Sequence, residues 1–353
     1  MSAASERAPS ETRRRLPEAP RMKALGLPSG WFVVATSAEL PPGGRLTTTF
    51  MSEELVLYRT ASGEARAISP HCPHLGAHLG HSGTVEGEHI RCEFHRFCFD
   101  GAGACVATGY GTSPPPTARL GTRPVREQHG VILVHHDPNG RAPSWQPPAL
   151  DLQGWSPLVL QRLTFRGHPQ DTTENSVDVG HFSIVHGYEN VRLSRPVRAF
   201  GPYLNARYTM SRGLGPLTRL GFTFDTEFEV HVHGLGYSLV EVDVHSHGFR
   251  TRQFVFVTPT EPGHIAVHLG VSVLVPRGAG PLTSLAPRGL IAGMLARFVS
   301  VLYAHDVGQD VRIWEHKRCP ERPALAQGDG PIGLYRRWAA QFYAGAEETI
   351  QEG

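Results

Sequence analysis

The chain has 353 residues and a formal net charge of +2, from 34 Lys and Arg against 32 Asp and Glu. Its length is enough for two domains that each bury a core, and its nearly balanced charge gives no electrostatic case for nucleic acid as a partner. The 20 His are many for a globular chain of this size, so metal chemistry is the first function to test.

Residues 1–24 show no hydrophobic period and contain an Arg run at 13–15, which predicts a disordered tail. They also lack the apolar run and the cleavage site of a secretory signal. Because the chain has 5 Cys, an odd number, we expect a cytoplasmic protein whose thiols are free or bound to metal.

Residues 25–145 are predicted to form a small all-β domain. Strand-like runs at 31–35 and 55–58 are separated by turns rich in Pro and Gly. A last run at 131–134 leads into a turn and then a Pro-rich linker, so we place the domain boundary near residue 146.

Residues 146–353 are predicted to form an α+β domain. Pro169 suits the first turn of a helix, and Asp171, Glu174 and Asp178 are expected to fall on that helix. Runs between residues 204 and 275 alternate apolar and polar side chains, as antiparallel strands do.

A second helix is predicted for residues 290–316, where the spacing is helical again and Pro320 follows. It contains the longest apolar stretch, 290–304, which Arg297 and Ser300 interrupt. A membrane span needs roughly 18 uninterrupted apolar residues. We therefore expect no integral membrane segment.

Two short motifs in the first domain each combine one Cys with one His. Cys72 and His74 are followed, after 17 residues, by Cys92 and His95. Two thiolates and two imidazoles are the ligands of a Rieske [2Fe-2S] cluster, in which the Cys pair binds one iron and the His pair binds the other. A Cys2His2 zinc site is the alternative, but zinc sites usually take both Cys from one loop and both His from another. The interleaved order therefore predicts a Rieske cluster.

A further motif in the second domain contains Glu174, Asp178, His181 and His186. Two His and one carboxylate on one face of an iron ion leave the opposite face open for O2 and substrate. His181 and His186 lie about 140° apart on an ideal helix. The helix must therefore distort or end near Gly187 if both are to reach one metal.

The third iron ligand must come from far along the chain, and Asp306 and Asp310 are the candidates. An apolar stripe runs along the helix that carries both, from Val299 to Trp314. Asp310 falls near the middle of this stripe, whereas Asp306 lies to one side. Because a buried carboxylate needs a cation, we choose Asp310 and keep Asp306 as the second choice.

Together the motifs resemble those of the α-subunits of Rieske non-haem iron oxygenases. The resemblance implies an N-terminal Rieske domain and a C-terminal catalytic domain with an antiparallel-sheet, helix-grip fold. It also implies a mononuclear Fe(II), O2 as co-substrate, attack on an unactivated C–H bond, and electrons from NAD(P)H that arrive through a separate reductase or ferredoxin. The pair Gln309 and Asp310 matches the family's third ligand. The second cluster loop departs from the common C-P-x-H-G-W, since Glu93 replaces Pro and Arg96 replaces Gly.

The resemblance also assigns two supporting residues and a subunit arrangement. The family residue that matches Asp178 bridges a Rieske His of the neighbouring subunit to an iron-ligand His. This implies a path from His95 of the partner subunit through Asp178 to His181, within a homotrimer. Asn175 matches a frequent Asn of the motif and is expected to reach the open iron face, with a helix-capping or a solvated Asn as the alternative.

The segment 314–343 resembles the steroid-acting branch of the family, which includes the oxygenase of 3-ketosteroid 9α-hydroxylase and the cholesterol 7-desaturases. The branch implies hydroxylation or desaturation of a hydrophobic small molecule such as a steroid or sterol. Ring hydroxylation, O-demethylation or oxidative cyclisation of another substrate is the alternative within the family, and a Rieske electron carrier is the alternative outside it. A carrier holds about two irons per chain and an oxygenase about three.

Overall fold

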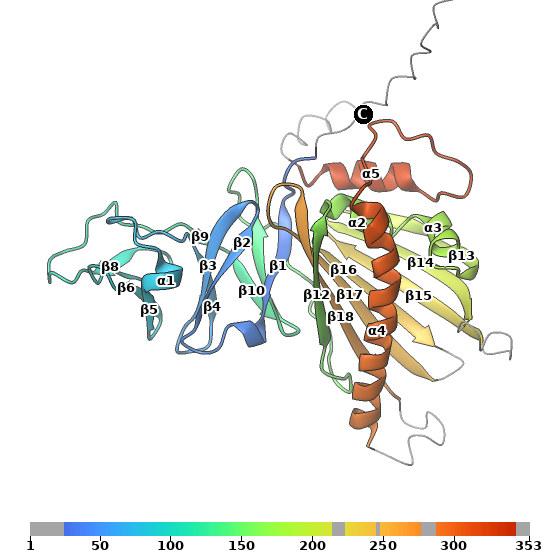
Figure 1. The fold of residues 1–353 in the computed structure, drawn as a ribbon, viewed down its shortest axis with the longest axis horizontal. Helices are drawn as coiled ribbons and strands as arrows, with labels where there is room; N and C mark the ends of the chain where they lie inside the picture. The colour runs from blue at the N-terminus through green and yellow to red at the C-terminus, as the bar shows by residue number, and fades with distance from the viewer. Residues whose placement is uncertain (1–24, 214–222, 245–247, 277–286, 344–353) are drawn as a thin grey trace, which may run out of the picture.

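The structure, a computed structural model, describes residues 25–213, 223–244, 248–276 and 287–343. The tail expected at 1–24 lies outside these ranges. Three small sheets occupy one end of the elongated molecule, and one large sheet with most of the helices occupies the other (Figure 1).

The three small sheets are built from the first half of the chain. The first contains β1 (Gly30–Thr36), β10 (Val125–Gln128) and β11 (Val131–His136); the second contains β2 (Arg45–Phe50), β3 (Glu53–Arg59), β4 (Ala65–Ile68) and β9 (Thr122–Arg123); the third contains β5 (Gly83–Glu86), β6 (His89–Cys92), β7 (Cys98–Phe99) and β8 (Cys105–Ala107). The 3-10 helix η1 (Ser37–Glu39) and the short helix α1 (Leu79–Ser82) lie between strands. The strands predicted at 31–35, 55–58 and 131–134 coincide with β1, β3 and β11, which confirms them.

One seven-stranded antiparallel sheet dominates the chain from residue 159 onward. Its order is β12 (Val159–Arg166), β18 (His264–Leu274), β17 (Phe249–Pro259), β16 (Tyr237–Val244), β15 (Thr223–His233), β14 (Tyr203–Gly213) and β13 (Glu189–Phe200). Strands β13 to β18 pair in succession, and β12 pairs with β18 at the edge. The alternation predicted between 204 and 275 is therefore confirmed for the described residues of that range, outside which 214–222 and 245–247 lie, and the α+β fold is confirmed as well.

The first half of the chain packs against the back of the large sheet. Trp31 and Val33 of β1 share a buried cluster with Tyr237 of β16 and Phe254 of β17. Gly236 permits this close approach, because a Cβ at that position would lie 2.4 Å from the carbonyl oxygen of Trp31. The front of the sheet is thus left for the helices.

Four helices are described after β12: α2 (Pro169–Glu174), α3 (Val179–Ile184), α4 (Arg288–Trp314) and α5 (Ile332–Ala340). Helix α4 runs across the front of the large sheet (Figure 1), where Val307 and Trp314 pack against Val267 and Leu269 of β18. It is the helix predicted for 290–316. Among the described helices, it is also the one whose length and hydropathy would permit a membrane span, although its inner side belongs to the core.

The prediction that one helix carries both Glu174 and Asp178 is wrong. Helix α2 ends at Glu174, and Asp178 is the N-cap of α3, with extended backbone at φ −79° and ψ 96°. Asp favours this position because its carboxylate accepts a hydrogen bond from a backbone N–H of the first turn. Helix α3 then ends at Ile184, so His186 lies beyond it, as the 140° offset requires.

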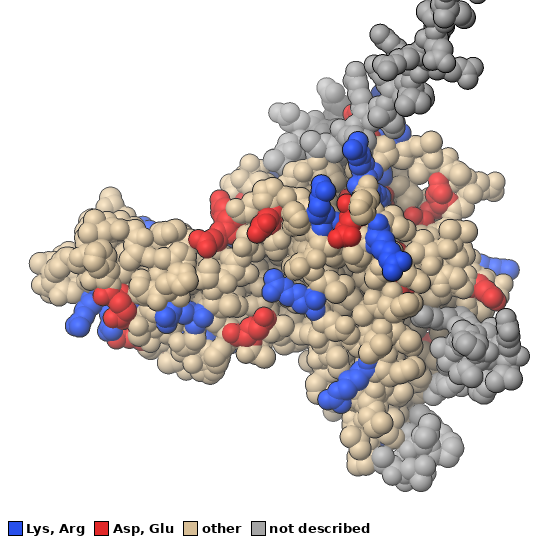
Figure 2. Space-filling view, in the orientation of Figure 1, with Lys and Arg blue, Asp and Glu red and all other residues tan. Residues whose placement is uncertain are grey.

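Charges are interspersed on the face of the molecule shown in Figure 2. Lys and Arg lie near Asp and Glu over a mostly uncharged surface, and no basic stripe crosses this face. On this face, positive and negative side chains are therefore mixed and not separated into patches of one sign.

Candidate metal centres and the adjoining cavity

The loops 72–77 and 92–97 have the same backbone pattern. In each, the N–H of the Cys donates to the carbonyl oxygen five residues later, and the N–H four residues later donates to the Cys carbonyl oxygen, at 2.8 to 3.0 Å. The fifth residue of each loop has positive φ, +77° at Gly76 and +56° at Arg96. The loops are therefore matched turns that present one Cys and one His each.

These turns bring Cys72, His74, Cys92 and His95 together. The His rings meet edge to face with centroids 4.7 Å apart. Burial raises the pKa of the Cys72 thiol to about 11, and the neighbouring Cys92 thiol adds to this rise. Nδ1 of His95 is buried and has no hydrogen-bond partner in the described part of the chain. Buried thiols and an unpartnered imidazole nitrogen fit a [2Fe-2S] cluster, because bound iron stabilises thiolates and accepts the imidazole lone pair.

The second metal set also converges. Ligand atoms of His181, His186 and Asp310 lie within 4.8 Å of one another. Nε2 of His186 is 3.4 Å from Oδ2 of Asp310, and both side chains are more than nine-tenths buried. The centroids of the two His rings are 5.1 Å apart. Two imidazoles and a carboxylate in this arrangement are the donor set of a facial triad.

The pKa of His181 and the geometry of His186 both fit a metal ion at this site. Burial lowers the pKa of His181, which favours the neutral, metal-binding form. Burial lowers the pKa of His186 as well, but its bonds with Asp310 and Gln309 outweigh this effect and raise the pKa above 6.5. Nε2 of His186 faces a carboxylate oxygen of Asp310, so a proton or a metal ion must lie between these two atoms. His181, His186 and Asp310 therefore fit Fe(II) as ligands.

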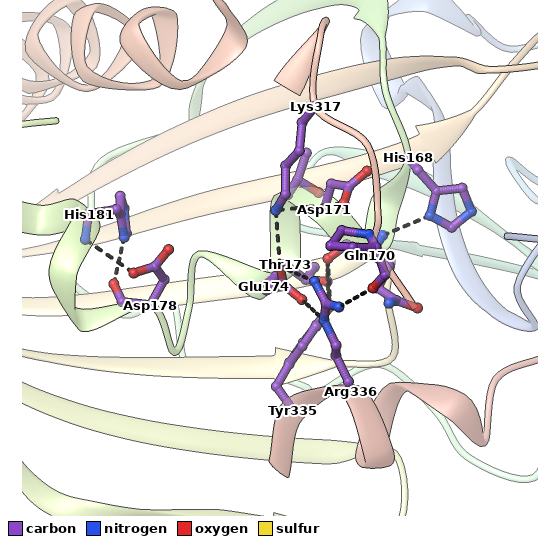
Figure 3. A network of polar contacts seen from close by, with 12 residues as sticks. His168, Gln170, Asp171, Thr173, Glu174, Asp178, His181, Lys317, Tyr335 and Arg336 are labelled. Carbon is purple, nitrogen blue, oxygen red and sulfur yellow. Dashed lines mark hydrogen bonds and ion pairs between the residues drawn. The ribbon is translucent and has the colours of Figure 1, made fainter. Parts of the chain in front are cut away.

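Asp178 makes a contact different from the one that the family resemblance implies. Its Oδ1 accepts a hydrogen bond from the backbone N–H of His181 at 3.2 Å, while Nδ1 of the His181 ring lies 2.6 Å from the backbone carbonyl oxygen of Asp178 (Figure 3). The main chain therefore orients the imidazole, and the carboxylate caps α3. The bridge to His95 of the partner subunit needs a second chain and stays a prediction.

Asp306, the second choice for the carboxylate ligand, has a protein partner. Its Oδ2 accepts a hydrogen bond from the hydroxyl of Tyr188 at 2.9 Å. This bond helps to offset the cost of burying the carboxylate. Asp306 lines the same cavity as Asp310 but is not a member of the three-residue metal group.

A buried charge network fixes α2 beside the metal residues (Figure 3). Glu174, at the end of α2, accepts hydrogen bonds from Arg336 of α5 at 2.6 and 3.1 Å and from Lys317 at 3.0 Å. The Tyr335 hydroxyl bonds to Thr173 in the same region. No local sequence pattern predicts this network, since the two cations stand 143 and 162 residues from Glu174.

A cavity of about 390 Å³ lies between the front of the large sheet and α4. Its sheet side is lined by Met210, Thr226, Phe228, Val230, Ser238, Val240, Val242, Val244, Phe249, Thr251, Gln253 and Val255. Its α4 side is lined by Leu295, Phe298, Val299, Leu302, Tyr303, Asp306, Val307, Asp310 and Trp314. His181, His186 and Asn175, which is the C-cap of α2, also line it. The metal set therefore opens onto a mostly apolar cavity.

Two family models match the chain. Residues 30–117 match the Rieske [2Fe-2S] domain, and residues 134–343 match the 3-ketosteroid 9alpha-hydroxylase C-terminal domain. The cluster residues fall in the first match, and the facial set falls in the second.

Similar proteins cover nearly the whole chain. The chain is 32% identical to a cholesterol 7-desaturase nvd of Bombyx mori, over 94% of the chain and 74% of that relative. It is 25% identical to the oxygenase component of a 3-ketosteroid-9-alpha-monooxygenase of Rhodococcus rhodochrous, over 92% of the chain and 84% of that relative.

Solved structures share the fold. Dicamba monooxygenase bound to dicamba superposes with a TM-score of 0.62 at 19% identity, over 92% of this chain and 98% of that one. Pseudomonas putida CBB5 NdmA with caffeine gives 0.66 at 19% identity, over 92% of each chain. Because both structures are only 19% identical in sequence to this chain, their similarity establishes a shared fold and no shared substrate.

Proposed function

Because the chain belongs to the Rieske oxygenases that carry a 3-ketosteroid 9alpha-hydroxylase C-terminal domain, we propose that it hydroxylates or desaturates an unactivated C–H position of a steroid, a sterol or a similar polycyclic molecule. The observation that carries this proposal is the position of His181, His186 and Asp310 on the wall of a long apolar cavity.

The length of the cavity supports a rod-shaped substrate. Its lining residues on α4 run from Leu295 to Trp314, a distance of roughly 28 Å at 1.5 Å per residue. Asp310 lies toward one end of this run, so a substrate can extend along the helix away from the metal site. A long wall of Val, Leu and Phe excludes water and suits a fused-ring hydrocarbon better than a small aromatic acid.

In this proposal each metal set has one role. Cys72, His74, Cys92 and His95 would hold a [2Fe-2S] cluster, which would supply electron transfer from a separate reductase or ferredoxin that draws on NAD(P)H. His181, His186 and Asp310 hold Fe(II), which supplies the site where O2 is activated.

The protein residues around the iron site act by orientation and exclusion. Gln309 accepts the Nδ1 proton of His186 and the carbonyl oxygen of Asp178 holds Nδ1 of His181, so Nε2 of each ring is left for the metal. Asn175 lines the cavity close to this set, where its amide can contact a molecule bound beside the metal.

We also propose a homotrimer in which one subunit's cluster serves another subunit's iron. Strands β5 to β8, which flank the cluster loops, lie at the end of the molecule opposite α3, so the two sets are far apart within one chain (Figure 1). Apolar side chains are exposed beside both: Leu75 and Phe94 are 64% and 61% exposed near the cluster, and Ile184 is 86% exposed on α3. Contact between these surfaces across subunits would bury them and shorten the electron path through Asp178.

We also propose a domain boundary near residue 146 and a cytoplasmic location. A domain boundary near residue 146 is supported by its place between the last strand of the small sheets, β11, and the first strand of the large sheet, β12. A cytoplasmic location is supported by the five Cys, which are all unpaired.

A spectroscopic screen tests the proposed substrate class. The reduced holoenzyme is treated with nitric oxide, and the signal of the mononuclear iron is recorded with sterols, steroids and small aromatics. Perturbation by sterols or steroids is expected, since a ligand in the cavity lies beside the ligand set. Perturbation by small aromatics alone would contradict the proposal.

A further inference from the structure

We infer that Ser238 and Gln253 form an oxygen-binding subsite in the cavity, which holds a hydroxyl or carbonyl group of the substrate and so selects which carbon faces the metal site. This inference rests on the proposed polycyclic substrate and adds a required polar substituent to it.

Ser238 supplies the first observation. It lies on β16, is only 5% exposed and lines the cavity. Its hydroxyl oxygen is buried and has no hydrogen-bond partner in the described part of the chain. Buried hydroxyl groups are nearly always paired, so one without a partner on a cavity wall is a donor and acceptor available to a ligand.

Gln253 lies next to Ser238 on the same face of the sheet. In the register between β16 and β17, Ser238 pairs with Val255 and Val240 pairs with Gln253, so the two polar residues are diagonal neighbours. Nε2 of Gln253 donates to Oγ1 of Thr251 at 3.2 Å, which holds the amide in place. A substrate hydroxyl can accept from Ser238 and donate to the Gln253 amide oxygen, and a substrate carbonyl can accept from Ser238.

The surroundings make this subsite selective. The neighbouring wall is formed by Val230, Val240 and Val255, which offer no side-chain hydrogen bond. A polar group on a buried substrate would lose its bonds to water without replacement against that wall. On this part of the wall the substrate oxygen is therefore drawn to Ser238 and Gln253, and the rigid ring system then sets the carbon that faces the ligand set.

Thr226 provides a matched control at the other end of the cavity. Its hydroxyl also lines the cavity and also lacks a partner among the described residues. Thr226 lies on β15 next to Glu227, which pairs with Asp243 of β16. Thr226 therefore stands opposite the end of β16 that is farthest from Ser238. At about 3.3 Å per residue, the two side chains are roughly 20 Å apart.

The test compares cholesterol with cholest-5-ene, which lacks the 3-hydroxyl group. Each sterol is titrated into the reduced, nitric-oxide-treated holoenzyme, and its Kd is read from the mononuclear iron signal. The wild-type protein is expected to bind cholesterol at least about tenfold more tightly, because the analogue leaves buried polar groups unpaired. Ser238→Ala and Gln253→Leu should each reduce this ratio toward one, and Thr226→Val should leave it unchanged.

The outcomes separate this inference from the proposed function. Equal affinity of the wild-type protein for both sterols, or a ratio that survives in both Ser238→Ala and Gln253→Leu, overturns the subsite while the sterol function stands. A normal iron signal that no sterol or steroid perturbs overturns the proposed substrate class, and the subsite falls with it. Cluster absorbance and iron content equal to wild type establish that each variant is folded.

Discussion

The imidazole of His186 is held at both nitrogens by consecutive residues of α4. Its Nδ1 lies 2.9 Å from Oε1 of Gln309, and its Nε2 lies 3.4 Å from Oδ2 of Asp310. The amide oxygen of Gln309 accepts the Nδ1 proton of His186. The Nε2 lone pair of His186 is therefore free to bind a metal ion, and it faces the carboxylate of Asp310. One turn of one helix thus supplies one proposed metal ligand, Asp310, and the group that orients another, His186.

Substitution of Gln309 should therefore weaken metal binding. Gln309→Leu removes the acceptor for the Nδ1 proton of His186, and we expect Fe(II) affinity to fall roughly 10- to 100-fold. Competition with an iron chelator measures this loss. Gln309→Glu keeps an acceptor oxygen at the same position and should lose much less, whereas equal losses in both variants would show that the hydrogen bond does not orient the ring.

Asp178→Asn separates metal binding from electron transfer. Asn caps a helix as well as Asp does, so α3 should keep its position and both metal sites should fill. Turnover coupled to substrate should nevertheless fall by roughly 100-fold, because the charge proposed to bridge His181 and the partner's His95 is removed. Metal analysis and oxygen uptake measure the two properties on one sample. Full activity in this variant would refute the bridging role.

Glu174→Gln should destabilise the fold. It leaves Arg336 partly buried without its carboxylate and leaves Lys317 with Asp171, 3.7 Å away, as its remaining carboxylate partner, which costs roughly 3 kcal/mol of the free energy of unfolding at neutral pH. Urea unfolding measures the difference. Glu64→Gln is the control, because Glu64 pairs with Arg66 at an exposed site. This variant should lose much less free energy of unfolding than Glu174→Gln.

The same variant has a defined pH dependence. Burial alone would raise the pKa of Glu174, but the bonds from Arg336 and Lys317 outweigh burial and lower the pKa below 4.5. A lowered folded pKa means that the carboxylate stabilises the fold fully above pH 4.5 and that this stability is lost as pH falls through the folded pKa. The difference in free energy of unfolding between the wild-type protein and Glu174→Gln should thus be constant near neutral pH and shrink below pH 4.5. A difference that grows below pH 4.5 would contradict the proposed role of the network.

Arg96→Gly should stabilise the cluster loop. Arg96 has φ +56°, a conformation that costs an L-residue about 1 kcal/mol and glycine much less. Thermal unfolding followed by cluster absorbance should show a higher Tm. Arg96→Ala removes the same charge but keeps the Cβ, so an equal gain in both variants would mean that charge, not backbone strain, is responsible.

Local patterns predicted much of the fold. The strands of the large sheet followed from alternation, and α4 followed from helical spacing, because each element buries one regular face. The failure at α2 and α3 has a local cause as well. Asp178 and Pro169 both suit helix starts, and only the structure distinguishes one long helix from two short ones.

Long-range contacts could not be read from the sequence in the same way. The Glu174 network joins residues from three distant segments, and the pairing of Tyr188 with Asp306 depends on how α4 lies over the sheet. The apolar stripe of the helix favours Asp310 over Asp306, yet both carboxylates are buried, at 6% exposure each. Only their partners distinguish them.

Iron content is the most direct test of the two-centre account. The wild-type protein should hold about three irons per chain, two in the cluster and one at the facial set. Asp310→Ala should hold about two, with an unchanged Rieske spectrum, while Asp306→Asn should keep about three. An Asp310→Ala protein that still holds three irons, or a wild-type protein that holds only two, would contradict the account.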